Sequence, residues 1–99
     1  MSNVVETIIS AKQAAKMAID YVDSFYRDLG IPISDIMLEE VEPSADDQSW
    51  QITIGFSHPN PASPIPNWVR KDDRKYKVVQ VSRSSGEIRS MKIRQIEAL

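Results

Sequence analysis

The chain has 99 residues, no cysteine and a formal net charge of −2 at pH 7. This length supports one hydrophobic core, so we expect a single domain over residues 1–99. The absence of cysteine excludes disulfides and thiolate metal sites. No apolar run approaches the roughly 18 residues of a membrane span, and residues 1–10 lack the Lys or Arg of a secretory leader. We therefore expect a cytoplasmic protein that makes no membrane contact.

The charge is unevenly divided along the chain. Residues 1–56 contain 3 Lys or Arg against 10 Asp or Glu, a net charge of −7, whereas residues 57–99 contain 9 against 4, a net charge of +5. In a folded protein the two halves either neutralise one another or form two patches that bind partners of opposite charge. The sequence leaves both alternatives open.

Residues 10–29 carry apolar side chains at intervals of three and four positions, which predicts an amphipathic helix. Ser10 followed by Gln13 is typical of a capping box at its start, and Gly30 with Pro32 is typical of its end. Small alanines in the first two turns predict a close approach to a sheet. The larger side chains that follow are expected to fill the far end of the core: Val22, Phe25 and Leu29.

Two strands are expected after the helix. Residues 35–42 form the first, and residues 43–49 form the turn that follows it. Residues 50–57 alternate without a break between large apolar and small or polar side chains, which predicts a central strand. Its large side chains are expected to face the helix: Trp50, Ile52, Ile54 and Phe56.

A long connection, residues 58–74, contains 4 of the 6 prolines of the chain. Proline lacks a backbone donor and fixes φ, so this segment is expected to run extended outside the sheet. A tryptophan on such a stiff loop loses little conformational entropy on binding, which makes the loop a candidate partner site. Its candidate residues are Ile65, Trp68, Val69 and Arg70. The alternative is that its three apolar side chains fold back over a gap at the end of the core.

Two alternating runs flank residues 84–87 near the C-terminus, which predicts a β-hairpin over residues 75–94. Gly86 is expected to supply the positive φ that the turn needs. With the helix and the two earlier strands, the hairpin predicts an α+β fold in which one N-terminal helix packs on a four-stranded antiparallel meander sheet.

In this meander the acidic strand 35–42 and the basic strand 88–94 lie at opposite edges of the sheet. Charged residues at an edge discourage pairing with another chain, but such an edge can also accept a partner strand. Pairing of two copies through these edges is a further alternative. The candidate partner-binding residues outside the connection are Glu39, Glu40, Asp47 and Arg89.

Three segments carry a resemblance to a known family. They are the helix start Ile9-Ser10-Ala-Lys-Gln-Ala14-Ala-Lys-Met-Ala18, the strand Trp50-Gln-Ile-Thr-Ile and the hairpin Tyr76-Lys-Val-Val-Gln-Val-Ser-Arg-Ser-Ser-Gly86-Glu87-Ile88. They cover about half of the chain and resemble PepSY-like domains, the small helix-plus-sheet modules of peptidase propeptides and related proteins. The resemblance implies this topology and a tendency to bind or inhibit other proteins, and it carries over no catalytic residue. Two features depart from it: PepSY domains are generally exported or membrane-attached, and the connection here is longer than their pattern.

The sequence offers no set of residues suited to catalysis. His58 is the only histidine, cysteine is absent, and neighbouring acids in a strand point to opposite faces. We therefore expect no enzyme activity, no catalytic residue, no cofactor and no metal site.

The expected function is a non-enzymatic protein-binding module that engages a larger protein through a sheet edge and the proline-rich connection. A small inhibitor, an immunity or antitoxin-type protein and an accessory subunit are concrete forms of it. The alternative is a nucleic-acid-binding protein that uses the basic C-terminal hairpin, because aromatic side chains on a basic sheet can stack bases. The acidic first strand shares that sheet, which argues against this alternative.

Overall fold

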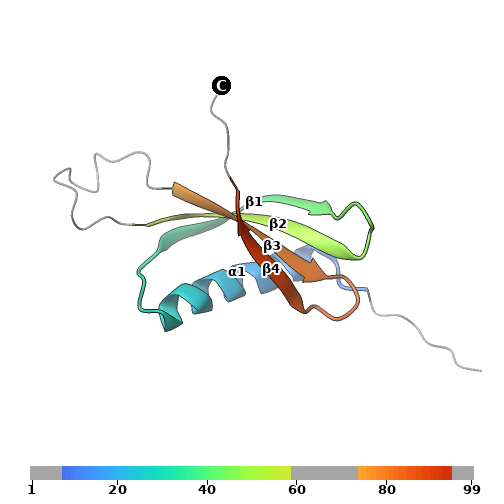
Figure 1. Ribbon diagram of the computed structural model, residues 1–99, viewed down its shortest axis with the longest axis horizontal. Helices are drawn as coiled ribbons and strands as arrows, with labels where there is room; N and C mark the ends of the chain where they lie inside the picture. Colours follow the sequence, from blue (N-terminus) through green and yellow to red (C-terminus); the bar gives the residue numbers. More distant parts are fainter. Residues whose placement is uncertain (1–7, 59–73, 95–99) are drawn as a thin grey trace, which may run out of the picture.

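One helix lies against one face of a four-stranded antiparallel sheet (Figure 1). This computed structural model describes residues 8–58 and 74–94. The strands follow one another across the sheet in the order β1-β2-β3-β4, which is a meander. The α+β fold predicted from the sequence is therefore confirmed. Most of the predicted connection, residues 59–73, lies outside the described residues.

The helix α1, Ala11–Asp28, begins at the predicted capping box. Ser10 Oγ accepts a hydrogen bond of 3.1 Å from the Gln13 N–H, and Gln13 Oε1 accepts one of 2.9 Å from the Ser10 N–H. These bonds satisfy two backbone donors that have no partner within the helix. The buried face is made of small side chains, as predicted: Ala14, Ala15, Ala18 and Val22.

Tyr26 closes the far end of the core, and the expectation that Phe25 and Leu29 do so is wrong. Phe25 is 37% exposed and Leu29 is 58% exposed, whereas the Tyr26 ring lies 5.1 Å from the Phe56 ring. Helical spacing allowed either outcome, because Phe25 and Tyr26 follow the buried Val22 by three and four positions. The chain after the helix decides between them: two partly buried side chains, Ile33 and Ile36, pack with Tyr26 against the core.

The four strands agree with the predicted segments to within one residue at most ends. They are β1 at Ser34–Pro43, β2 at Ser49–Ser57, β3 at Arg74–Ser82 and β4 at Ile88–Ile93. The ladder between β2 and β3 is unbroken, whereas the β1–β2 ladder contains two register shifts and the β3–β4 ladder contains one. The central pair is therefore regular, and the irregularities fall on the two outer strands.

The core lies between α1 and the central strands. Ile52, Ile54 and Phe56 of β2 are at most 1% exposed, as predicted, and pack with Val79 and Val81 of β3 in the same cluster. Burying each such side chain contributes about 1.5–3 kcal/mol before entropic costs. Trp50 is only partly buried, because it stands at the end of the strand.

The helix packs mainly against β1, β2 and β3. This leaves the last residues of β4 beyond its cover, and Ile93 is 75% exposed. Within residues 8–58 and 74–94, no helix combines the length and the apolarity needed to cross a bilayer.

Candidate partner-binding surfaces

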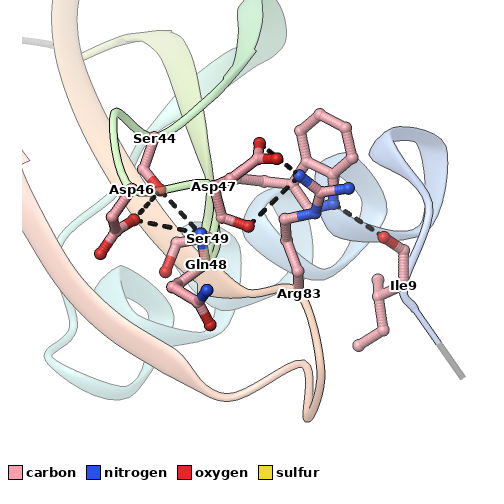
Figure 2. A network of polar contacts seen from close by, with 8 residues as sticks. Ile9, Ser44, Asp46, Asp47, Gln48, Ser49 and Arg83 are labelled. Atoms are coloured by element: carbon pink, nitrogen blue, oxygen red, sulfur yellow. Dashed lines mark hydrogen bonds and ion pairs between the residues drawn. The ribbon is translucent and has the colours of Figure 1, made fainter. Parts of the chain in front are cut away.

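The two hairpin turns and the start of α1 meet at one end of the sheet (Figure 1). There the indole Nε1–H of Trp50 donates a hydrogen bond of 2.7 Å to the carbonyl oxygen of Ile9. The guanidinium of Arg83 lies 4.7 Å from the centre of the Trp50 ring, and its Nη1 donates to Asp47 Oδ1 at 2.7 Å (Figure 2). One hydrogen bond and one cation–π contact of Trp50 therefore join the helix entry to both turns.

Asp47, a predicted partner-binding residue, lies in the turn between β1 and β2 with a φ of 63°. Asp tolerates this left-handed conformation better than most residues. Its ion pair with Arg83 leaves 74% of the Asp47 side chain exposed. The carboxylate is accessible to a partner, although Arg83 balances part of its charge. The sequence did not predict this pair, whose members stand 36 positions apart.

The same turn holds Asp46 in a second polar network (Figure 2). Ser44 Oγ donates to Asp46 Oδ1 at 2.6 Å, and the Gln48 N–H donates to the same oxygen at 3.1 Å. Because these donors favour the ionised carboxylate, Ser44 more than Gln48, they lower the pKa of Asp46. A carboxyl group with a lowered pKa is a poor proton donor near neutral pH. The network therefore holds the carboxylate as a hydrogen-bond acceptor that closes the turn.

Two arginine–glutamate pairs lie on the open face of the sheet, the face turned away from α1. Arg74 Nη2 lies 3.2 Å from Glu39 Oε1. Arg94 Nη1 lies 2.5 Å from Glu40 Oε1 and donates to Thr53 Oγ1 at 2.7 Å. Arg94 thus reaches across the sheet from the end of β4 to β1. The Arg94–Glu40 pair joins the acidic and basic edges, whereas Arg74 reaches Glu39 from the inner strand β3. Glu39 and Glu40 thus both have partners within the molecule.

Gly55 makes room for the first of these pairs. A Cβ atom at this position would lie 2.9 Å from Glu39 Oε1 and 3.1 Å from Arg74 Nη2. The pair therefore rests directly on the backbone of β2. Thr53, on the same face, is only 2% exposed because Arg94 covers it. The centre of the open face is thus covered by the chain's own side chains.

The β1 edge is poorly suited to pairing with another strand. Its two register shifts lie between Ser34 and Met37 and between Leu38 and Glu40, and such bulges interrupt the row of backbone groups. The Ser44 N–H bonds the Ser49 carbonyl toward β2. Hydrogen-bonding direction alternates along an antiparallel strand, so the backbone of Pro43 faces outward, where proline has no N–H to donate.

The β4 edge is more available. The Arg94 N–H bonds the Tyr76 carbonyl at 3.0 Å, so by the same alternation the backbone groups of Met91 and Ile93 point away from β3. No strand of the described chain lies on that side of β4. Arg89, a predicted partner-binding residue, is exposed in the register shift near the start of β4.

The predicted site residues thus fall into three groups. Glu39, Glu40 and Asp47 form ion pairs within the molecule, and Arg89 lies exposed at the β4 edge. The remaining four, Ile65, Trp68, Val69 and Arg70, lie outside the described residues, so their role stays a prediction.

Sequence reasoning placed Lys92 among the charged residues of the β4 edge but missed Ile93. Both residues are exposed, and Ile93 carries the largest exposed fraction among the large apolar side chains of the described chain. No local signal marked Ile93, because its lack of cover depends on where the helix lies across the sheet, against β1, β2 and β3.

The described residues offer no metal centre, because no three of their His, Asp or Glu side chains are grouped closely enough to share an ion. A pocket beside the C-terminal end of α1 is lined by Asp23, Arg27 and residues 30–33. Asp23 and Arg27 pair with one another there, so the pocket holds a neutral ion pair beside backbone and apolar groups.

Comparisons with protein-family models, with curated proteins and with solved structures found no match for this chain. What the protein binds must therefore be inferred from its own surfaces.

Proposed function

We propose that this chain is a non-enzymatic, cytoplasmic protein-binding module that engages a larger protein through the edge of its sheet. A small inhibitor, an immunity or antitoxin-type protein and an accessory subunit are forms of this function. The resemblance to PepSY-like domains also favours binding to another protein. The proline-rich connection is the second proposed contact.

The observation that carries the proposal is the β4 edge. Its outward backbone groups at Met91 and Ile93 can pair with a partner strand, as in domains that bind extended peptides by strand addition. Beside them Ile93 keeps 75% of its surface exposed, so a strand added at this edge would also bury apolar surface. The opposite edge also exposes two apolar side chains, Met37 and Leu38, but Pro43 and two register shifts interrupt its backbone groups.

The test is affinity purification of the tagged chain from its native host, performed with wild type, Ile93→Glu and Lys16→Glu. Lys16 is exposed on the helix, which packs mainly against β1, β2 and β3 rather than β4, so Lys16→Glu controls for added negative charge away from that strand. We expect a co-purifying protein whose recovery falls with Ile93→Glu and not with Lys16→Glu. Circular dichroism checks that both variants are folded. Equal recovery with all three proteins, or no co-purifying protein, contradicts the proposal.

The nucleic-acid alternative has weaker support. In the register of the sheet Lys75 and Lys77 lie opposite Phe56 and Ile54, on the helix side, whereas Lys92 lies opposite Val78, on the open face. The hairpin cations are therefore divided between two faces rather than gathered on one platform. This alternative requires oligonucleotide binding at low salt that weakens steeply as salt is added.

A further inference from the structure

We infer that the β4 edge accepts an extended segment of a partner protein in which acidic and apolar side chains alternate, and that this segment adds to the sheet as a fifth strand. The inference rests on the proposed function and names the chemistry of the partner at the same edge. Three features carry it: the direction of the free backbone groups, the alternation of the β4 side chains, and the charge beside the edge.

The backbone supplies the affinity in this mode of binding. Met91 and Ile93 each present one N–H and one carbonyl group to the outside of β4, as the Arg94–Tyr76 hydrogen bond establishes for this ladder. A partner strand can pair with both residues without moving β4. Arg89 has no partner in the β3 ladder, because Ser90 pairs with Gln80 and Ile88 pairs with Val81. This register shift sets one end of the regular edge.

The alternation of the β4 side chains determines which side chains a partner strand would meet on each face of the sheet. Met91 lies opposite the core residue Val79, so Met91 and Ile93 face the helix side of the sheet. Lys92 lies opposite Val78 and faces the open side. Residues directly opposite in neighbouring strands share a face. A partner strand therefore meets apolar side chains on the helix side and a lysine between them on the other side.

The cations beside the β4 edge favour a partner segment that carries negative charge. Lys92 and Arg89 are exposed, and no acid of the described chain lies within ion-pair distance of either cation. Arg89 acts on Asp46 only at longer range, where it contributes weakly to the lowered pKa of that carboxyl group. Four arginines of the described chain do have acid partners: Arg74 and Arg94 over the open face, Arg83 at the turn end and Arg27 on the helix. A partner residue opposite Lys92 is thus best matched by a carboxylate, and its neighbours by apolar side chains.

A second copy of the chain fits this edge poorly. Symmetric antiparallel pairing of two β4 strands brings the cations of both copies together, because the strand carries Arg89 and Lys92 and no acid. Like charges across a strand pair are destabilising. Pairing with β1 of a second copy supplies acids, but Pro43 and the register shifts interrupt that edge.

The experiment uses the isotopically labelled chain and three synthetic peptides of equal length, which alternate valine with glutamate, glutamine or lysine. We expect the valine–glutamate peptide to bind most tightly, to shift the amide signals of Met91 and Ile93, and to protect these amides from exchange with solvent. Lys92→Glu should weaken this peptide by roughly tenfold, since attraction becomes repulsion, and should favour the valine–lysine peptide instead. Lys16→Glu is the matched control and should change neither affinity.

Ile93→Pro removes the outward N–H at one position and should abolish binding of all three peptides. Ile93→Ser keeps the backbone N–H and should only weaken peptide binding. Comparison of the two variants therefore separates the contribution of backbone hydrogen bonds from that of the apolar side chain. Equal affinity for all three peptides, or signals that shift on the open face or the turn end, overturns the inference. It is also overturned if Met91 and Ile93 are already protected in the free protein, because a second copy or another part of the chain then fills the edge.

The two proposals fail in different ways. A captured protein whose recovery depends on Ile93, together with peptides that show no preference for glutamate, leaves the protein-binding function standing and removes the inference. Peptide binding with the expected preference, together with no protein captured from the host, contradicts the proposed function. The inferred preference of the β4 edge for an alternating acidic and apolar segment then still stands.

Discussion

At the scale of single residues, Trp50 combines three contacts that usually belong to separate side chains. Its ring packs against the core cluster, its Nε1–H bonds the Ile9 carbonyl, and its face receives the Arg83 guanidinium. The turn of the β3–β4 hairpin also covers the helix start, because Gly86, with a φ of 76°, leaves no space for a Cβ against Ile9. The predicted need for glycine at Gly86 is confirmed, and the close packing adds a second reason for it.

Trp50→Phe tests how much the polar part of this contact contributes. The substitution keeps an aromatic ring but removes the hydrogen bond to Ile9 and weakens the cation–π contact. We expect the free energy of unfolding to fall by about 1–3 kcal/mol, measured by urea unfolding followed by circular dichroism. Tyr21→Phe is the control, because no described residue bonds the Tyr21 hydroxyl, and it should change stability by less than about 0.5 kcal/mol. Equal effects of the two substitutions would show that the indole N–H is irrelevant.

At the scale of elements, the helix and strands could be predicted because each depends on side chains close together in sequence. The capping box joins Ser10 to Gln13, three positions apart, and the strand alternation repeats every second residue. The cover of the open face could not be predicted in this way. Thr53 is buried by Arg94, which stands 41 positions later, and no local pattern marks a threonine that a distant arginine will cover.

At the candidate site, too, the features set by local sequence could be predicted, and the contacts between distant residues could not. Alternation correctly placed the acidic and basic strands at opposite edges, because that placement depends only on strand order. It could not show that Glu40 pairs with Arg94 across 54 positions, or that a register shift leaves Arg89 unpaired. Edge charges therefore looked alike in sequence, whereas the structure separates those with internal partners from Arg89 and Lys92.

Two isoleucines on the same side of the sheet test the extent of helix cover. Ile54 is fully buried on β2, whereas Ile93 is 75% exposed on β4. We expect Ile54→Ala to lower the free energy of unfolding by about 2–5 kcal/mol, and Ile93→Ala to lower it by less than about 0.5 kcal/mol. Thermal and urea unfolding measure both. A large loss with Ile93→Ala would mean that this side chain stabilises the fold and is not kept exposed for a partner.

At the scale of the whole molecule, the sheet has one blocked edge and one open edge, with opposite charges on the two outer strands. Such a molecule is at risk of head-to-tail association, in which β4 of one copy pairs with β1 of the next. That contact does not close on itself, so it leads to chains of molecules rather than dimers. Irregular backbone on β1 is the structural feature that opposes it, and Pro43 is its simplest part, since it faces outward without an N–H.

Pro43→Val restores the missing donor and places a good strand former at the blocked edge. We expect wild type to sediment as a monomer at low and high salt, and Pro43→Val to associate with rising concentration, more strongly at low salt, because salt screens the attraction between acidic β1 and basic β4. Pro32→Val, in the exposed connection before β1, is the matched control and should remain monomeric. If Pro43→Val also stays monomeric, the register shifts alone block this edge. If wild type already associates, the expectation of pairing between copies is favoured, and the β4 edge is not free for another protein.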